Sequence, residues 1–444
     1  MLRWFLADLR TGRQILDLPV LSARGRRLLN RPETLEVSLD LNDPDVVALQ
    51  PRNTTAPGKA VLACAVGDVV LAAGPIWARD YDRNSGVLTV SAKGLWSYYD
   101  HRHILPLLAA TVALTDFTVV DPENEGGTMP NPDLRTTLTG WELGTIAKKL
   151  VEQAHAWSGG SVPVVFEDDR AGVHERNYEG AEFESLGDVL ARLQEVEGGP
   201  DIRFAPRFTT DKLGIEWVLE TGTEAAPLLG SSVTHRWDVT APDSPVSNLS
   251  IREDASRLAD LGWATGGRAA DETLVARSYG STLVDLGYPL FEVTSSHGSV
   301  VEQPTLDAHA SHLTGYGAAP VEVWSFDVEA ASQPFLGAYL EGDYCELDIA
   351  PYGSTTYTAS AFTGAESGYF TTDGFTPAEA GYYSTDGLTE VEPGYYSSGT
   401  ATESGLVGDP YIREGGTFRH RIIGFGWDQD GEVVSVECQP KGAE

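Results

Sequence analysis

Near its C-terminus the chain contains the stretch Arg421-Ile-Ile-Gly-Phe-Gly-Trp427, Asp428-Gln-Asp-Gly431 and Glu432-Val-Val-Ser-Val-Glu-Cys438. Its two arms flank Asp430-Gly431, a strong tight-turn signal, so the stretch predicts a β-hairpin. Another β segment, Phe335 to Ile349, comes earlier in the chain. Together the two segments predict a C-terminal β-barrel domain, residues 331–350 and 417–444, which a long insertion, residues 351–416, interrupts.

The insertion contains nearly the same sequence three times, with a period of 13 residues. The copies are Phe362–Gly374, Phe375–Gly387 and Leu388–Gly399. A fixed period indicates a unit that is stabilised by packing on its neighbours. Each copy carries an aromatic pair directly after a glycine, and these six residues are the candidate contact residues: Tyr369, Phe370, Tyr382, Tyr383, Tyr395 and Tyr396.

Three interpretations of the aromatic pairs stay open. The rings suit a stack in which each copy packs on the next. Exposed tyrosine faces among Gly, Ser, Thr and Asp also suit stacking on the sugar rings of a host cell-surface glycan, or contact with a neighbouring protein. The third interpretation is an unstructured spacer.

Length and composition predict a β-rich α+β protein of several domains. At about 150 residues per domain, 444 residues exceed one hydrophobic core. Tyr 17, Trp 10 and Gly 47 favour β structure. Besides the C-terminal barrel and its insertion, we expect an N-terminal barrel-like domain of closely spaced strands, an α+β domain and a second α+β or β domain: residues 1–100, 101–240 and 241–330.

Local patterns place the elements of these domains. Leu143 to Ala154 repeats apolar residues at helical spacing, and a second helix begins after Ser185, a suitable N-cap. A third helix opens at Pro304. In the first domain the strands are separated by turn signals, among them Asn42-Asp43-Pro44 and Gly74-Pro75.

Charge is unevenly distributed. The net charge of −34 argues against a nucleic-acid-binding surface, because phosphates would be repelled. Residues 1–31 hold seven Arg and two Asp, whereas residues 278–412 contain no Lys or Arg and 19 Asp and Glu. Those carboxylates must be solvated, bind cations or face a basic surface elsewhere, and we expect solvation.

The sequence contains no catalytic constellation. The motifs G-x-S-x-G, G-x-x-x-x-G-K, H-E-x-x-H and G-x-G-x-x-G are absent. We therefore expect no enzymatic activity, no cofactor and no metal. The weaker candidates have simpler explanations. His309 and His312 with Asp307 are expected on a helix surface and His101 and His103 on a strand surface, while Asp121 to Glu125 suit a loop and Asp428 to Gly431 a turn. Glu182, Glu184 and Asp188 suit the start of a helix, and Cys64, Cys345 and Cys438 are expected to be small buried residues.

Four groups of motifs, in this order, resemble siphophage tail hub proteins. Val90-Ser-Ala-Lys-Gly-Leu-Trp-Ser-Tyr-Tyr-Asp-His-Arg-His-Ile104 resembles the segment that closes their first barrel. The run from Tyr178 to Leu193, leading to Gly199-Pro-Asp-Ile-Arg-Phe204, is similar to their central α+β motif. The third group resembles their third region and consists of Asn248 to Arg257, Gly287 to Glu292 and Thr305 to Ala310. The fourth group resembles their closing barrel and consists of Tyr339-Leu-Glu-Gly-Asp-Tyr-Cys-Glu-Leu347 and Arg421 to Trp427.

The resemblance covers most of residues 1–350 and 417–440 and leaves the insertion outside. It implies a virion structural protein, a minor tail protein at the phage tail tip or baseplate hub, assembled in the host cytoplasm. Such hubs are homotrimers whose paired barrels match the distal tail protein hexamer, next to the tape measure protein and other tail-tip or receptor-binding proteins. Because the chain ends at Glu444, directly after the closing strand, we expect no appended lysin domain.

The sequence thus predicts a structural tail hub that closes the distal tail tube and serves host attachment. The alternative is a glycan- or receptor-binding tail-tip protein that acts through residues 362–399. A peptidoglycan hydrolase is disfavoured by the missing constellation. No apolar stretch is long enough for a transmembrane helix.

Overall fold

The computed structural model describes residues 2–107, 117–124, 126–196, 198–241, 243–269, 272–297, 303–360 and 400–440. Most of its elements are strands with a few helices between them, which confirms the β-rich α+β class. The chain forms two compact units. Unit 1 comprises Met1–His235, Val246–Cys345 and Arg419–Glu444, and unit 2 comprises Arg236–Pro245 and Glu346–Phe418. Within the described ranges, no helix has the length and apolarity needed to cross a membrane.

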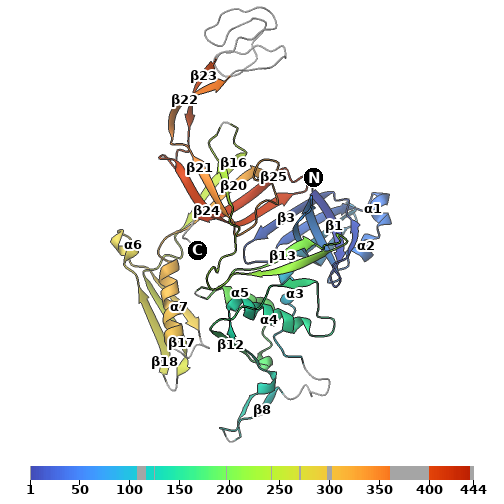
Figure 1. The fold of residues 1–444 in the computed structure, drawn as a ribbon, viewed down its shortest axis with the longest axis vertical. Coiled ribbons are helices and arrows are strands. Elements are labelled where there is room, and N and C mark those ends of the chain that lie inside the picture. The colour runs from blue at the N-terminus through green and yellow to red at the C-terminus, as the bar shows by residue number, and fades with distance from the viewer. Residues whose placement is uncertain are drawn as a thin grey trace, which may run out of the picture. The chain divides into compact units, whose positions relative to one another are not determined.

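One continuous sheet joins the two ends of the chain in the order β16-β20-β25-β24-β3-β4-β7-β6-β5-β1-β2 (Figure 1). Every neighbouring pair in this path is antiparallel. The strands are β1 (Leu2–Asp8), β2 (Gln14–Asp17), β3 (Ser22–Leu28), β4 (Thr34–Asp40), β5 (Ala60–Val66), β6 (Val69–Asp82), β7 (Val87–Lys93), β16 (Val246–Asp254), β20 (Val321–Glu329), β24 (Gly416–Asp428) and β25 (Val433–Pro440).

The predicted C-terminal hairpin is confirmed as β24 and β25, which pair from His420 and Pro440 to Trp427 and Val434. The other edge of β24 pairs with β3, where Trp427 lies opposite Gly25. A Cβ atom on Gly25 would lie 2.4 Å from the Trp427 ring, so the indole needs a glycine there. The N-terminal and C-terminal strands therefore belong to one sheet. In the described residues no pairing joins β2 back to β16, so the path is open.

One hydrophobic core joins strands of this sheet to a helical layer. It includes side chains from α3 (Trp96–Tyr99), α4 (Leu143–His155), α5 (Leu186–Gln194), β13 (Ile202–Phe208) and β14 (Ile215–Thr221), which pairs with β11 (Val164–Phe166). The predicted stripe of α4 is buried, and Ser185 caps α5 by accepting a hydrogen bond from the Asp188 NH at 3.4 Å. Both helix predictions are confirmed.

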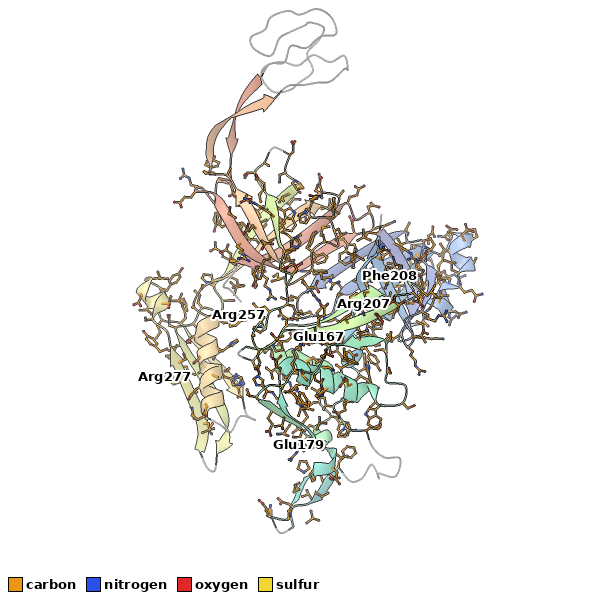
Figure 2. The ribbon with its side chains drawn as sticks, viewed as in Figure 1. Glu167, Glu179, Arg207, Phe208, Arg257 and Arg277 are labelled. Carbon is orange, nitrogen blue, oxygen red and sulfur yellow. The ribbon has the colours of Figure 1, made fainter. Side chains whose placement is uncertain are left out.

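Arg207 and Phe208, the last two residues of β13, point to opposite faces of the strand (Figure 2). Phe208 stacks on Phe5 with ring centroids 5.8 Å apart, while Arg207 donates to Glu216 at 2.8 Å. This alternation is the pleat of a strand. The remaining elements of the first 240 residues are short: α1 (Pro44–Ala48), α2 (Pro51–Thr54), β8 (Thr118–Val120), β9 (Thr128–Pro130), η1 (Pro132–Leu134), β10 (Thr136–Trp141), β12 (His174–Tyr178) and η2 (Gly180–Glu182).

A separate small core forms between a helix and a three-stranded sheet of residues 261–316. The predicted third helix is confirmed as α7 (Gln303–Tyr316). Its Leu306 and Ala310 pack on Ala264 and Ala276. The other elements are β17 (Leu261–Ala269), β18 (Glu272–Tyr279), α6 (Thr282–Asp285) and β19 (Glu292–His297).

In unit 2 a two-stranded ribbon carries the ends of the insertion. β22 (Gly353–Ser360) and β23 (Thr400–Val407) pair antiparallel, with Ser360 opposite Thr400 as the last pair. The pairing therefore brings Ser360 and Thr400 together. β15 (Thr234–Asp238) and β21 (Tyr344–Ile349) also pair.

Some sequence expectations for the first domain are wrong. Gly74-Pro75 is not a turn, because β6 runs through both residues. Asn42-Asp43-Pro44, in contrast, does follow a strand as predicted: β4 ends at Asp40, Leu41 and Asn42 form a turn, and Asp43 is the N-cap of the short helix α1. The segment around Arg102 is not a strand: His101 follows α3 and stacks on Trp77, with ring centroids 4.6 Å apart.

At Gly74, strand β6 lies very close to the backbone of Lys93, the last residue of β7. A Cβ atom there would lie 1.8 Å from the Lys93 carbonyl oxygen, and backbone cannot yield as a flexible side chain can. We expect Gly74→Ala to lower the free energy of unfolding by about 1–3 kcal/mol, the usual cost of overpacking. Gly280→Ala is the matched control, since its Cβ would meet open space. Chemical denaturation measures both; equal unfolding free energies would contradict the close contact.

Candidate functional site

The six aromatic residues singled out in the repeats lie outside the described residues. The structure describes only the ribbon that leads to them, β22 and β23. The contact role of Tyr369, Phe370, Tyr382, Tyr383, Tyr395 and Tyr396 stays a prediction.

The histidines of α7 do not converge with Asp307. His309 stacks on His297 of β19, with ring centroids 3.8 Å apart, while His312 lies against Tyr316. Desolvation, together with His297 and His312, lowers the pKa of His309. Asp307 accepts a hydrogen bond from Gln303 at 2.9 Å. Across the described ranges, no group of three or more His, Cys, Asp and Glu is placed to hold a metal ion.

The carboxylates weighed as ligands or acids shape the backbone or pair locally. Asp121 accepts the Glu123 NH at 2.9 Å within its loop, and Asp428 accepts the Gly431 NH at 3.1 Å in the hairpin turn. Glu184 pairs with Arg192 at 2.6 Å. The three cysteines are buried and free, and burial raises the pKa of the Cys64 thiol to about 12.

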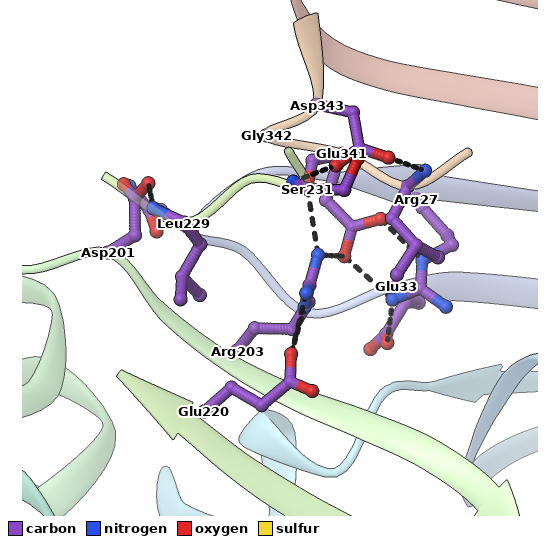
Figure 3. A network of polar contacts seen from close by, with 12 residues as sticks. Arg27, Glu33, Asp201, Arg203, Glu220, Leu229, Ser231, Glu341, Gly342 and Asp343 are labelled. Atoms are coloured by element: carbon purple, nitrogen blue, oxygen red, sulfur yellow. Dashed lines mark hydrogen bonds and ion pairs between the residues drawn. The ribbon is translucent and has the colours of Figure 1, made fainter. Parts of the chain in front are cut away.

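The structure instead brings together a buried polar network that local sequence patterns do not indicate (Figure 3). Its centre is Arg27 of β3. The Arg27 guanidinium donates to both carboxylate oxygens of Glu341, each at 2.7 Å. The two residues are 1% and 3% exposed. Glu33, also buried, lies 3.9 Å from the same guanidinium, so one arginine faces two carboxylates.

The segment from Asp201 to Arg203 connects the network to β13. Arg203 donates to the Glu341 backbone carbonyl at 2.8 Å and to the Glu220 carboxylate at 2.6 Å. Asp201 accepts from Asn30 at 2.7 Å and pairs with Arg421 of β24. Side chains from four distant parts of the chain thus share one cluster.

Backbone groups complete the network. Arg421 donates to the carbonyl oxygens of Leu229 and Gly342, at 2.8 and 3.1 Å. Asp343 accepts the Ser231 NH at 2.6 Å and lies 3.4 Å from His235. Burial opposes ionisation of Asp343, but these hydrogen bonds and one from the Leu340 NH hold its pKa below the usual value. Fully bonded buried charges of this kind fix one arrangement of the surrounding backbone.

The Glu33 carboxyl of this cluster has a raised pKa. Burial raises its pKa to about 7, against the attraction of Arg27, and the nearby Glu341 adds to the increase. The bidentate pair leaves Glu33 at longer range, so a neutral carboxyl is favoured there.

A groove of about 670 Å³ lies over the sheet face of β3, β4, β6, β7, β24 and β25. Both of its arginines form ion pairs with residues of the same chain. Arg24 pairs with Glu36 at 2.8 Å and Arg26 pairs with Glu437 at 2.7 Å. The groove has an apolar floor that includes Trp77 and Trp427, without converging unpaired groups that would select a small ligand.

We expect Arg27→Met to lower the free energy of unfolding by about 3–5 kcal/mol, because it leaves Glu341 buried without its partner. Arg24→Met is the matched control on the same strand. Its pair with Glu36 is exposed, so its loss costs less than about 1 kcal/mol. Urea denaturation measures both variants, and similar losses would contradict the central place of Arg27.

The Glu33 carboxyl makes stability depend on pH. The folded chain keeps its proton up to about pH 7, whereas the unfolded chain loses it near 4.5. The folded state therefore binds more protons in this window, and its stability falls by about 3 kcal/mol as pH rises from 4.5 to 7. Glu33→Gln should remove this part of the slope, measured by denaturation at pH 5, 6 and 8. Parallel profiles of the two proteins would refute it.

Two solved structures share this fold along the whole chain. A tail protein from Neisseria meningitidis MC58 aligns with a TM-score of 0.51 and 11% identity, over 100% of this chain and 97% of that chain. The 43 kDa tail protein of prophage MuSo2 from Shewanella oneidensis aligns with a TM-score of 0.50 and 10% identity, over 100% of both. No protein-family model and no curated protein matches the chain by sequence. The structural neighbours are phage tail proteins, which confirms at the level of the fold the resemblance drawn from the sequence motifs.

Proposed function

We propose that this chain is a structural hub of a phage tail tip, which closes the distal tail tube as a homotrimer. The observation that carries the proposal is the likeness to two phage tail proteins, which covers 100% of this chain and 97% and 100% of those chains. The proposed place is the virion, after assembly in the host cytoplasm. A fold alone does not determine function, so the arrangement of this chain's own residues has to support the role.

The open sheet supports a role in building a tube wall. Its path holds an N-terminal group of strands, β1 to β7, and a C-terminal group, β16, β20, β24 and β25, joined where β3 pairs with β24. The first group lies within residues 1–100, the predicted N-terminal domain, whereas the second adds β16 and β20 to strands of the predicted C-terminal domain. Three copies would present six such groups, which matches a hexameric ring of distal tail protein above them.

The buried network also supports a structural role, because it makes the scaffold rigid. Arg27, Asp201, Glu341 and Arg421 belong to both strand groups and to the segment before β13, and all four side chains are buried. Such a cluster resists relative movement of the parts it joins, because any displacement leaves charges without partners. Rigidity suits a hub between the distal tail ring, the tape measure protein and other tail-tip proteins.

The acidic balance supports the same role. A net charge of −34 disfavours specific binding of phosphate, so DNA would pass a wall of this kind without adhering to it.

The second candidate function is recognition through the insertion. The paired strands β22 and β23 bring together Ser360 and Thr400, the residues on either side of 361–399. In this proposal the aromatic pairs of the repeats contact a host glycan or a receptor-binding partner. In this version the hub is the anchor and the repeat is the contact.

Removing Gly364–Gly399 and closing β22 to β23 with a tight turn should leave the hub folded. The reason is that the ribbon already brings the two ends together. We expect an unchanged melting temperature and oligomeric state, and at least a tenfold loss of adsorption by particles that carry the shortened chain. Adsorption and tail assembly at wild-type levels would remove the recognition role and leave the structural one.

The structural role is tested in a phage that encodes this chain. Without the chain, we expect tail tubes that lack a closed tip and particles that do not infect, both restored by supplying the chain in trans. Electron microscopy of purified particles and a plaque assay give the readouts. Complete tails without the chain would contradict the proposal.

A further inference from the structure

One surface of the 261–316 region exposes an ordered apolar loop. Four apolar side chains after β18 are exposed, with Leu286 at 70%, and they are Val284, Leu286, Tyr288 and Leu290. Monomeric surfaces seldom gather apolar side chains in this way unless they serve an interaction.

Hydrogen bonds within the loop and to Asp260 hold its backbone in place. Leu283 is buried and its NH donates to the Asp260 carboxylate at 3.2 Å, while the Tyr288 NH donates to the Leu283 carbonyl at 2.9 Å. The Asp260 NH in turn donates to the Phe291 carbonyl at 3.0 Å. The exposed side chains therefore stand on a fixed backbone, which suits a preformed contact surface.

The border of this loop is acidic. Asp285 and Glu292 lie within and beside it, and neither forms an ion pair among the described residues. No Lys or Arg occurs between residues 278 and 412. We call the four apolar residues with Asp285 and Glu292 the acidic apolar patch.

A second surface of the same chain has the opposite charge. At the β1–β2 turn, the Gln14 NH donates to the Leu213 carbonyl at 3.0 Å and the Leu9 NH to the Lys59 carbonyl at 2.9 Å. Ile15 and Leu213 are exposed here, at 46% and 58%. The adjoining cations are Arg10, Arg13 and Lys59, none of which is in an ion pair within the described part of the chain. We call these five residues the basic apolar patch.

We infer that the acidic apolar patch of one copy binds the basic apolar patch of the next copy. Within the described residues none of these charged groups is in an ion pair, although Arg13 attracts Asp211 at longer range. Each patch combines exposed apolar side chains with charged ones, as protein interfaces do. Copies that each carry −34 repel one another unless cations meet anions locally. In the proposed trimer this contact is heterologous, with the acidic apolar patch of each copy against the basic apolar patch of the next, and three such contacts close the ring.

The inference rests on the proposed trimeric hub and names the surfaces that join its copies. It also specifies the order of contacts, with residues 284–292 of each copy against the β1–β2 turn of its neighbour. The four apolar residues supply the centre of the contact, and the rest of the interface completes the area that a stable trimer requires.

Charge reversal on one patch and then on both provides the test. Asp285→Lys with Glu292→Lys should raise the dissociation constant of the trimer at least tenfold, and Arg10→Glu with Lys59→Glu should do the same. The chain with all four substitutions regains opposite charges and should recover most of the trimer. Light scattering during size-exclusion chromatography at low and high salt gives the masses, with melting curves to confirm folding.

Two further variants separate a contact from a general surface effect. Leu286→Asp should weaken the trimer, whereas Val173→Asp should not, although Val173 is 87% exposed. A wild-type monomer, or a trimer unaffected by either charge reversal, would overturn the inference. If the charge reversals do not change the trimer, the structural role is not affected. That role is tested separately by examining phage particles made without the chain.

Discussion

The bidentate pair between Arg27 and Glu341 is the interaction on which the rest of the structure depends. Two ions removed from water cost several kcal/mol each, so the pair is stable only with both partners and the surrounding hydrogen bonds in place. Arg203 and the paired Arg421 and Asp201 supply those bonds from distant parts of the chain. The network therefore requires the N-terminal strands, the segment before β13 and the C-terminal strands to be assembled together.

This constraint explains how the chain tolerates a long insertion in its last domain. More than sixty residues separate β21 from β24. Even so, Arg421 of β24 donates to the Gly342 carbonyl just before β21 and pairs with Asp201, while Asp343 accepts the Ser231 NH. The ribbon of β22 and β23 isolates the insertion by pairing its ends.

Local patterns predicted the parts of this fold whose causes are local. Periodicity located α4 and α5, the Ser185 cap was correct, and Asp430-Gly431 located the C-terminal hairpin. The strand β3 was missed, and Gly74-Pro75 was misread because the reason for that glycine is the distant Lys93 carbonyl. Solvation was expected for the carboxylates of residues 278–412, but Glu341 is buried against Arg27 of the basic N-terminus. The motifs that resemble tail hub proteins contain Asp201, Arg203, Glu341, Asp343 and Arg421. The physical role of these residues becomes visible only in the folded chain.

The most direct test of the account is a cryo-electron microscopy map of the phage particle that carries this chain. The account predicts three copies at the distal end of the tail tube, each with β3 and β24 paired in one continuous sheet of the tube wall. Density for the chain elsewhere in the particle, or a tail tip that does not contain it, would contradict the account.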